Sequence, residues 1–467
     1  MALQFHNTLG NKKEVFKPIN EGEVRMYTCG PTVYDFAHIG NFRTYIFEDL
    51  LRRYLKYKGY RVIQVMNLTD VDDKTIRGAR REKISLDEYT ARFKQAFFED
   101  IDTLGIERAE VYPEATKHIP EMVELIKRLM TKGFAYRAED GSIYFRISSF
   151  LEYGKLSGKI LTDLKPTGRV RADEYTKEEV SDFALWKAWD EEDGDVWWET
   201  ELGRGRPGWH IECSAMSMKY LGETFDIHTG GIDNIFPHHE NEIAQSESAT
   251  GKKFVNYWLH SAHLIVEGKK MSKSLGNYYT LRDLLNKGFN PLAIRYLLIS
   301  THYRVGLNFT FEALKSAGAA IDRLAELLHT LDHFQSDSST DNPDIEKILE
   351  EIRQGFESSL DDDLNISPAL ASIFEGIKRL NKLIRDVGLS VADAIRIRNL
   401  LFKLDTVLGI LPETKVVDSE IERLVARRDI ARKNKDYAEA DKIREELNKR
   451  GIIIEDTPKG TIWRKKI

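Results

Sequence analysis

The sequence predicts an α/β protein in which a parallel sheet is followed by an α-helical bundle and a small C-terminal α+β domain. A strand at residues 23–28, a helix at 41–58 and a strand at 61–66 follow one another, in the order of a parallel crossover unit. Residues 112–199 then change character and read as an insertion, after which the sheet resumes. Beyond residue 310 the apolar spacing is almost wholly helical, which favours a bundle.

Composition and charge narrow the class of protein. A chain of 467 residues holds about three domains on the usual prior of ~150 residues each. Its 42% hydrophobic and 31% charged residues are typical of a globular protein. No run approaches the ~18 apolar residues of a membrane helix, and no export signal opens the chain, so we expect a cytoplasmic protein without a membrane partner. The net charge is −6, yet residues 423–467 carry 14 basic and 8 acidic residues, which makes this tail the candidate for contact with nucleic acid.

The remaining elements follow from local patterns. The insertion has a helical stretch at 119–132 and a hairpin signal at Asp140-Gly141. The sheet resumes with a strand at 225–228 and a helix at 238–250. The helical part is predicted at 310–331 and 345–408 around a polar linker at 336–343. The tail is predicted as one charged helix at 420–450 and two short strands at 452–454 and 461–463.

Two segments have the composition of a phosphate clamp. Residues 27–41 lead from a strand into a helix, so the first helical amides can face a phosphate beside His38 and Asn41. Residues 267–274 form a glycine-hinged loop whose lysines can meet several phosphate oxygens. Either segment alone is more often an ordinary turn or a solvated loop. Both together favour chemistry on a bound nucleotide, at the edge where parallel strands end.

The two cysteines suggest a metal. Cys29 and Cys213 are far apart, and a reducing compartment disfavours a disulfide between them. His238 and Glu242 lie four apart on one helical face, so two thiolates, an imidazole and a carboxylate can form a zinc site. The spacing from His239 to Glu242 is also allowed, and two small buried apolar cysteines are an equally good interpretation.

At this point the sequence resembles a known family. His38-Ile-Gly-Asn41 is similar to the HIGH signature, and Lys270-Met-Ser-Lys-Ser274 matches the KMSKS signature, of class I aminoacyl-tRNA synthetases. Four further segments resemble the cysteinyl-tRNA synthetase family in particular, at residues 28–34, 67–74, 208–214 and 236–242. The resemblance continues through 300–304, 361–365, 437–444, 456–458 and Trp463, and therefore covers nearly the whole chain.

The resemblance implies an activity and its residues. The family activates L-cysteine with ATP to cysteinyl-adenylate, releasing pyrophosphate, and transfers the cysteine to the 3′ end of tRNA(Cys), with one zinc per chain and magnesium with ATP. The implied catalytic residues are His38, Asn41, Lys270 and Lys273. The implied ATP-binding residues are Gly40, His228 and Lys273. The implied zinc ligands are Cys29, Cys213, His238 and Glu242.

Other implied contacts rest on fewer residues. The amino-acid pocket would include Gly30, Thr69, Trp209 and Asp233, although a tryptophan beside a buried cysteine is more often plain core. The tRNA contacts would include Arg427, Arg428 and Trp463, against the alternative of a solubilising charged helix. We expect a monomer. The charge run at 77–83 is interpreted as a solvated face.

The resemblance also implies domain boundaries and a use for zinc. The Rossmann-type catalytic domain would be split into 1–111 and 200–265 around the insertion at 112–199, followed by a signature loop and stem-contact region at 266–309, a helical bundle at 310–416 and an anticodon-binding domain at 417–467. A pocket that relies on size separates cysteine from serine by only ~1–3 kcal/mol. A zinc ion that accepts the substrate sulfur would select by softness instead.

Two rival functions share part of this pattern. A related ligase that joins cysteine to an amino sugar would keep both signatures and the zinc but lack the terminal region at 423–467. A zinc-containing RNA-binding regulator descended from a synthetase would not need His38, Asn41, Lys270 and Lys273. The sequence therefore favours the tRNA ligase over both.

Overall fold

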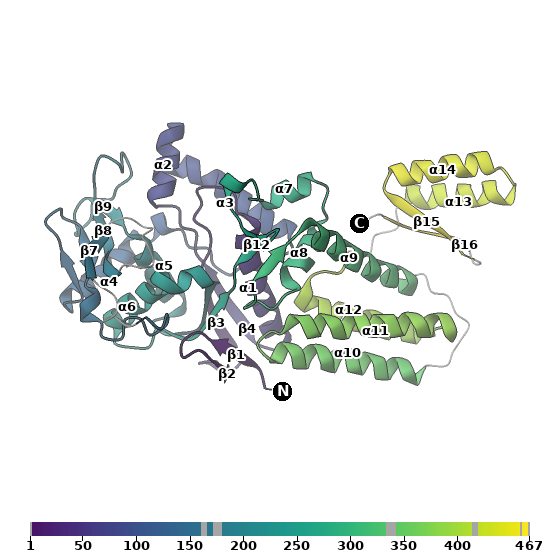
Figure 1. Ribbon diagram of the computed structural model, residues 1–467, viewed down its shortest axis with the longest axis horizontal. Helices are drawn as coiled ribbons and strands as arrows, with labels where there is room; N and C mark the ends of the chain where they lie inside the picture. The colour runs from purple at the N-terminus through teal and green to yellow at the C-terminus, as the bar shows by residue number, and fades with distance from the viewer. Residues whose placement is uncertain are drawn as a thin grey trace. The chain divides into compact units, whose positions relative to one another are not determined.

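The computed structural model describes residues 2–159, 166–170, 180–332, 342–412, 419–457 and 460–465. The chain forms two compact units (Figure 1). The first comprises Met1–Phe311 with Gln354–Ile373, and the second comprises Glu312–Arg353 with Phe374–Ile467. The five-part domain division expected from the sequence stays a prediction.

The first unit is built on a parallel four-stranded sheet. Its order is β11-β10-β3-β4, formed by β11 (Val255–Ser261), β10 (Phe225–Gly231), β3 (Glu23–Thr28) and β4 (Arg61–Met66). All three pairings are parallel, with Thr28 opposite both Thr229 and Met66. The predicted α/β fold is therefore confirmed, and β11 is a strand that the sequence analysis did not propose.

Helix α1 (Ile39–Tyr57) connects β3 to β4, as predicted. It begins at His38, whose Nδ1 accepts a hydrogen bond from the Asn41 backbone N–H at 3.1 Å, while Asn41 Oδ1 accepts one from the His38 N–H at 3.0 Å. This reciprocal cap satisfies two amides that a helix start leaves unpaired. The same two residues that resemble a catalytic signature therefore also fix where α1 starts.

The rest of the first unit surrounds this sheet. The helices after β4 are α2 (Asp73–Glu82) and α3 (Leu86–Thr103). The predicted insertion contains α4 (Ile119–Thr131) and a second sheet of order β5-β6-β8-β7, in which β9 also pairs with β8. These strands are β5 (Ala135–Arg137), β6 (Ile143–Phe145), β7 (Pro166–Val170), β8 (Val180–Ala188) and β9 (Gly205–Pro207). The hairpin predicted at Asp140-Gly141 joins β5 to β6.

Shorter elements complete this unit. Helices α5 (Trp209–Leu221) and α6 (Glu240–Thr250) flank β10 in the chain, and α7 (Leu281–Asn286) and α8 (Pro291–Ile299) come after β11. The remaining strands are β1 (Gln4–Asn7), β2 (Lys12–Val15), β12 (Leu264–Val266), β13 (Lys269–Lys270) and β14 (Leu307–Phe309).

The helical part after residue 310 begins with α9 (Phe311–Asp332) and α10 (Pro343–Asp361) and continues with α11 (Ile366–Asp386) and α12 (Val391–Leu408). Helices α10 and α11 each contribute residues to both units. The predicted linker at 336–343 lies outside the described residues except for its last two positions.

The C-terminal part corrects one prediction. The single helix expected at 420–450 is wrong, because the chain forms two helices, α13 (Ser419–Lys433) and α14 (Tyr437–Lys449). The break contains Lys435 with φ of 58°, a left-handed conformation that ends a helix. The two predicted strands are confirmed as the antiparallel pair β15 (Ile452–Thr457) and β16 (Gly460–Lys465).

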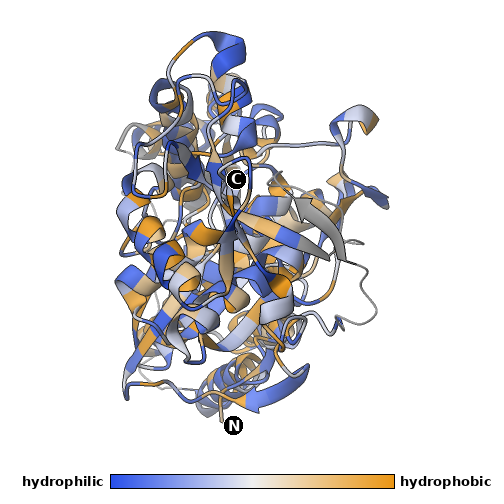
Figure 2. Ribbon diagram, turned by 90° about the vertical axis from the view of Figure 1, so that its left-hand side faces the viewer, coloured by the Kyte–Doolittle hydropathy of each residue, from blue (hydrophilic) through white to orange (hydrophobic). Residues whose placement is uncertain are grey.

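Hydropathy is mixed along the helices (Figure 2). Within the described ranges, none of the helices combines the length and the apolar content that crossing a membrane requires. Apolar residues of the tail instead form a core of Ile421, Val425, Ile443, Leu447 and Ile452.

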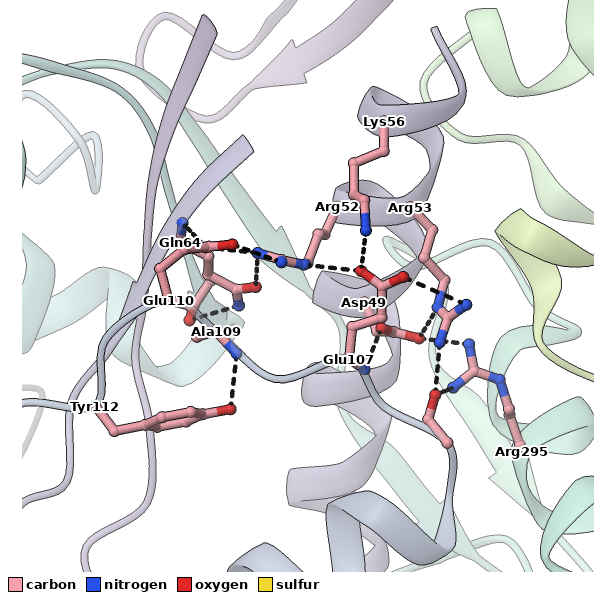
Figure 3. A network of polar contacts seen from close by, with 12 residues as sticks. Asp49, Arg52, Arg53, Lys56, Gln64, Glu107, Ala109, Glu110, Tyr112 and Arg295 are labelled. Atoms are coloured by element: carbon pink, nitrogen blue, oxygen red, sulfur yellow. Dashed lines mark hydrogen bonds and ion pairs between the residues drawn. The ribbon is translucent and has the colours of Figure 1, made fainter. Parts of the chain in front are cut away.

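A buried ion network joins α1 to the segment before the insertion (Figure 3). The Asp49 side chain is completely buried and accepts hydrogen bonds from Arg53 Nε at 2.7 Å, the Glu107 N–H at 2.8 Å and Arg295 Nη2. The Arg295 side chain is 1% exposed and also donates to the Leu104 and Gly105 carbonyls. One carboxylate on α1 therefore ties together two segments that are distant in sequence.

Removing this carboxylate should destabilise the first unit strongly. Asp49→Ala leaves the Arg295 guanidinium buried without its counter-charge, so we expect a loss of about 3–5 kcal/mol in the free energy of unfolding. Urea unfolding followed by near-UV circular dichroism measures it. Asp102→Ala is the control, since Asp102 pairs with Arg108 at 2.7 Å while both are about half exposed, and it should cost about 1 kcal/mol or less. Equal losses in both variants would contradict the role of burial.

Candidate functional site

The candidate site lies where the parallel strands end. Cys29 directly follows β3, and its N–H donates to the Thr229 carbonyl of β10 at 3.3 Å. The Gly30 N–H donates to Asn67 Oδ1, after β4, at 2.9 Å. A Cβ atom at Gly30 would lie 1.8 Å from the Asn67 carbonyl oxygen. Only glycine therefore allows this close approach of the two chain segments at the edge of the sheet.

Sulfur, imidazole and carboxylate groups meet at this edge. Ligand atoms of Cys29, His238, His239 and Glu242 all lie within 4.8 Å of one another. His238 Nε2 lies 3.1 Å and His239 Nε2 lies 3.9 Å from Glu242 Oε1, and His239 Nε2 lies 3.2 Å from Cys29 Sγ. Cys213, on α5, is 1% exposed and hydrogen-bonds to Cys29 and His238. All four ligands expected from the sequence thus come together, with His239 as a fifth group.

Burial and mutual contact shift the proton affinities of these groups. The hydrogen bond from Cys29 holds the pKa of Cys213 well below its usual value, although burial opposes this, and the pKa of Cys29 is raised in turn. Burial raises the pKa of Glu242 well above its usual value, and the charge of Cys213 adds to this. The pKa of His238 is raised by Glu242 and Cys213 against the effect of burial. The anionic forms of Cys29 and Glu242 are therefore disfavoured here unless a cation compensates their charge.

The donor set fits a zinc ion. Glu242 Oε1 is buried and receives no hydrogen bond from any residue that the structure describes. Two sulfurs, imidazole nitrogens and one carboxylate oxygen are the ligand types that zinc takes. The residues could hold the metal without recruiting further side chains.

A second layer of imidazoles orients the first. His210 Nδ1 lies 2.9 Å from His238 Nδ1, and His260 Nε2 lies 2.8 Å from His239 Nδ1. His260 Nδ1 in turn contacts Thr8 Oγ1 at 2.7 Å. Burial lowers the pKa of His260 to about 3, so its ring is neutral and able to fix the tautomer of His239. The sequence signalled this layer only as a crowding of histidines around Cys213.

The residues predicted to bind the amino acid and the nucleotide have different surroundings in the structure. The Trp209 ring stacks on His238 with centroids 4.2 Å apart, which puts it beside the cluster. Thr69 Oγ1 donates to the buried Glu212 at 3.0 Å, whereas Asp233 is exposed. His228 is completely buried and its Nε2 lies 3.0 Å from Glu242 Oε2. Its ring therefore supports the cluster, and its predicted contact with ATP stays a prediction.

The two signatures adjoin each other. The Ile39 N–H donates to the Tyr279 carbonyl at 3.0 Å, and the His38 ring packs edge-on against Tyr278 with centroids 5.3 Å apart. Lys273 Nζ lies 5.0 Å from the Tyr278 ring centroid. Burial lowers the pKa of His38, which favours the neutral form of its imidazole. His38, Asn41 and Lys273 are thus brought together, and a Cβ at Gly40 would contact both His38 and Met271.

The two lysines of the second signature, Lys270 and Lys273, differ in their contacts. Lys270 is exposed in β13, opposite Ile265. Lys273 Nζ pairs with Asp35 Oδ2 at 2.5 Å, on the turn before His38. Asp35 is a residue that the sequence analysis did not single out.

The expected tRNA contacts lie in the C-terminal part. Arg427 is exposed and forms an ion pair with Glu439. Arg428 is 4% exposed, and its Nη1 donates to Thr461 Oγ1 at 3.0 Å. This burial assigns Arg428 to holding α13 against β16. Trp463 lies in β16 opposite Ile454, and its predicted stacking on RNA bases stays a prediction.

Three parts of the chain match known families. Residues 15–319 match the family described as tRNA synthetases class I (C) catalytic domain. Residues 355–412 match a DALR domain, and residues 414–464 match the cysteinyl-tRNA ligase anticodon binding domain. The matches cover most of the sequence in the order expected from its motifs.

Curated relatives match over their whole length. A cysteine–tRNA ligase of Protochlamydia amoebophila (strain UWE25) is 52% identical, with 100% of this chain and 98% of the relative covered. One of Brachyspira hyodysenteriae (strain ATCC 49526 / WA1) is 53% identical, with 99% of each covered.

Solved structures share the fold at low identity. Methionyl-tRNA synthetase of Mycobacterium tuberculosis in complex with methionyl-adenylate has a TM-score of 0.60 at 15% identity, covering 83% of this chain and 90% of that chain. A putative arginyl-tRNA synthetase from Campylobacter jejuni has a TM-score of 0.56 at 14% identity, covering 86% and 95%.

A buried acid beneath the site predicts a pH dependence. Glu48, on α1, is completely buried and accepts a hydrogen bond from Thr229 Oγ1 at 2.7 Å. Burial raises its pKa to about 8, partly offset by that hydrogen bond. The folded state then retains a proton that the unfolded state releases above about pH 4.5, so Glu48 makes the protein less stable as pH rises from about 4.5 to 8.

Glu48→Gln should remove this penalty while keeping an acceptor for Thr229. We expect the variant to gain stability over wild type, by more at pH 8 than at pH 5, at about 1.4 kcal/mol for each pKa unit. Urea unfolding at the two pH values measures the difference. A stability difference independent of pH would contradict the raised pKa.

Proposed function

Because this chain belongs to the cysteine–tRNA ligase family of class I tRNA synthetases, we propose that it activates L-cysteine with ATP and transfers it to tRNA(Cys). The observation that carries the proposal is the buried cluster of thiols, imidazoles and a carboxylate beside the two signature segments. The match of residues 414–464 to an anticodon binding domain supports RNA as the acceptor, in preference to an amino sugar. We also propose that the protein is a monomer and is located in the cytoplasm.

The proposed reaction has two steps. A cysteine carboxylate oxygen bonds to the α-phosphorus of ATP while the bond to the departing pyrophosphate breaks. A ribose hydroxyl at the 3′ end of the tRNA then attacks the carbonyl carbon of the adenylate, AMP leaves, and the hydroxyl proton is released. Neither step needs a side-chain nucleophile, so we assign His38, Asn41, Lys270 and Lys273 to donating hydrogen bonds and charge to phosphate oxygens. Magnesium would accompany ATP.

We assign Cys29, Cys213, His238 and Glu242 to holding zinc, with His239 as the alternative imidazole. When bound, zinc supplies a soft partner for the sulfur of cysteine, which the hydroxyl of serine matches poorly. The chain itself keeps the ligands in place, because His210 contacts His238 and His260 contacts His239. Trp209 stacks on His238 and would form a wall of the amino-acid pocket. Gly30, Thr69 and Asp233 would line the same pocket, with Gly40 facing the nucleotide side.

Cysteine-dependent exchange of pyrophosphate into ATP, followed by charging of tRNA(Cys), tests the function directly. Exchange with cysteine and its near absence with serine are expected. Exchange without charging would support the amino-sugar rival, and RNA binding without exchange would support the regulator.

Cys213→Ser should lose metal and amino-acid activation together. The variant replaces a soft sulfur by an oxygen at a completely buried position. Zinc should fall below one per chain, and kcat/KM for cysteine in the exchange assay should fall by at least about tenfold. Ser217→Ala, one turn further along α5 and equally buried, is the control and should keep both. Unchanged zinc in Cys213→Ser would remove Cys213 from the ligand set.

Lys273→Ala should slow the first step and leave the metal in place. The loss of one charged donor to the transferring phosphate is expected to reduce the exchange rate by about 10²- to 10³-fold. Atomic absorption should find the same zinc content as in wild type. Lys287→Ala removes an exposed lysine after α7 and serves as the control. An unaltered exchange rate in Lys273→Ala would exclude the assigned role.

A further inference from the structure

A cavity of about 720 Å³ lies next to Lys273, within the first unit. The turn at residues 34–36 and helices α2 and α3 form its walls, and none of the thiols or imidazoles of the metal cluster lines it. Its volume falls within the range of about 300–1,000 Å³ that is typical of ligand sites. The cavity thus shares one lysine with the signature loop and is otherwise separate from the site described above.

The lining is strongly basic. Five cationic side chains face two carboxylates, and both carboxylates are engaged. Glu82 accepts two hydrogen bonds from Arg92, at 2.6 and 2.7 Å, and Asp35 pairs with Lys273. Each carboxylate of the lining is therefore already paired with a cation, and the lining keeps an excess of positive charge.

Lys74, Arg77 and Arg81 form a cationic stripe on α2. They are three and four positions apart, so they lie on one face of the helix. Arg77 and Arg81 are exposed, and neither has an ion-pair partner among the residues that the structure describes. At a rise of ~1.5 Å per residue the stripe is ~10 Å long, which suits successive phosphates of a strand better than one ion. The charge run interpreted as a solvated face is thus partly the wall of a cavity.

Aromatic rings face the same space in fixed positions. The Tyr89 hydroxyl donates to the Tyr34 carbonyl at 2.8 Å, and Lys74 Nζ lies 4.9 Å from the Tyr34 ring centroid. Phe36 packs edge-on against Phe93 with centroids 5.5 Å apart. A Cβ at Gly78 would lie 2.2 Å from the Tyr89 ring, so a glycine within α2 lets the two helices meet here. Cations that follow a backbone beside aromatic rings are characteristic of sites for single-stranded nucleic acid.

The start of α2 is not arranged for a compact anion. The Asp72 side chain already accepts hydrogen bonds from the Lys74 and Thr75 N–H groups, at 2.9 and 2.8 Å. The free amides that hold a phosphate at a helix N-terminus are therefore occupied. This leaves side-chain cations along the helix as the phosphate-binding groups.

We propose that this cavity binds the single-stranded 3′ end of the RNA substrate, with Lys74, Arg77 and Arg81 contacting its phosphates. The inference rests on the proposed function, because that function requires the 3′ end of a tRNA to reach the edge of the sheet where Lys273 lies. Lys273 belongs to both the cavity and the signature loop, so the RNA would enter beside the loop that is proposed to bind ATP.

Arg77→Glu and Arg81→Glu test this inference, with Lys83→Glu as the control. Lys83 is exposed, follows α2 directly and does not line the cavity, so it carries the same charge change nearby. We expect each cavity variant to raise the KM for tRNA(Cys) and the Kd for the uncharged tRNA by about tenfold. The slope of log K against log salt should become shallower by about 0.7 for each phosphate that the variant no longer neutralises. The control should match wild type in every assay.

A truncated tRNA shows which part of the RNA the cavity binds. For a tRNA lacking its unpaired 3′ nucleotides, wild type and variants should bind equally. Equal weakening for both RNAs would overturn the inference in favour of a contact to the duplex stem. Slower exchange of pyrophosphate into ATP by the variants in the absence of RNA would overturn the inference in favour of ATP or pyrophosphate as the ligand. Cavity variants that behave like Lys83→Glu in every assay would also overturn it. Failure of the proposed function appears separately, as absent exchange in wild type.

Discussion

The parallel pairing of β3 with β10 is the constraint on which the site depends. Thr28 lies opposite Thr229, so Cys29 leaves the sheet beside the strand that leads to His238 and Glu242. Strands that run parallel end at the same edge, which brings residues from distant parts of the chain to one place. The long insertion between the two strands adds little to the cost of this arrangement, because loop-closure entropy grows slowly with length.

Placing the cluster in the interior has an electrostatic cost that its own members offset. The two thiols belong to an apolar cluster with Phe225 and Trp258, and Glu242 is completely buried. Burial there disfavours each isolated charge. The groups respond by sharing protons through hydrogen bonds. The hydrogen bond from Cys29 holds the pKa of Cys213 well below its usual value, while His228 and His260 stay neutral because burial lowers the pKa of each to about 3. A divalent cation would replace these shared protons, which links metal retention to the proton balance of the whole cluster.

Much of the secondary structure could be predicted from local sequence patterns. Features that depend on contacts between distant residues could not be predicted in this way. Strands β3 and β4 were predicted with the correct bounds, since apolar runs and a glycine stop delimit them. The break at Lys435 was missed, although its neighbours Asn434 and Asp436 are weak helix formers and Asp436 caps the start of α14. Spacing showed that His238 and Glu242 share a helical face, but not whether His239 also reaches the carboxylate. That depends on the turn before α6, where both Nε2 atoms face Glu242.

The ion pair of Lys273 with Asp35 would allow one loop to serve both proposed ligands, the nucleotide and the RNA. The lysine is 65% and the carboxylate 32% exposed, and an ion pair of this kind contributes about 1 kcal/mol or less. A phosphate carries more charge than one carboxylate and can take the lysine from Asp35 at little cost. The ion pair therefore keeps Lys273 near both the nucleotide side and the basic cavity without committing it to either. Since Lys273 lines the cavity and also lies over Tyr278, beside His38, a ligand bound at one of the two proposed sites would change the charge at the other.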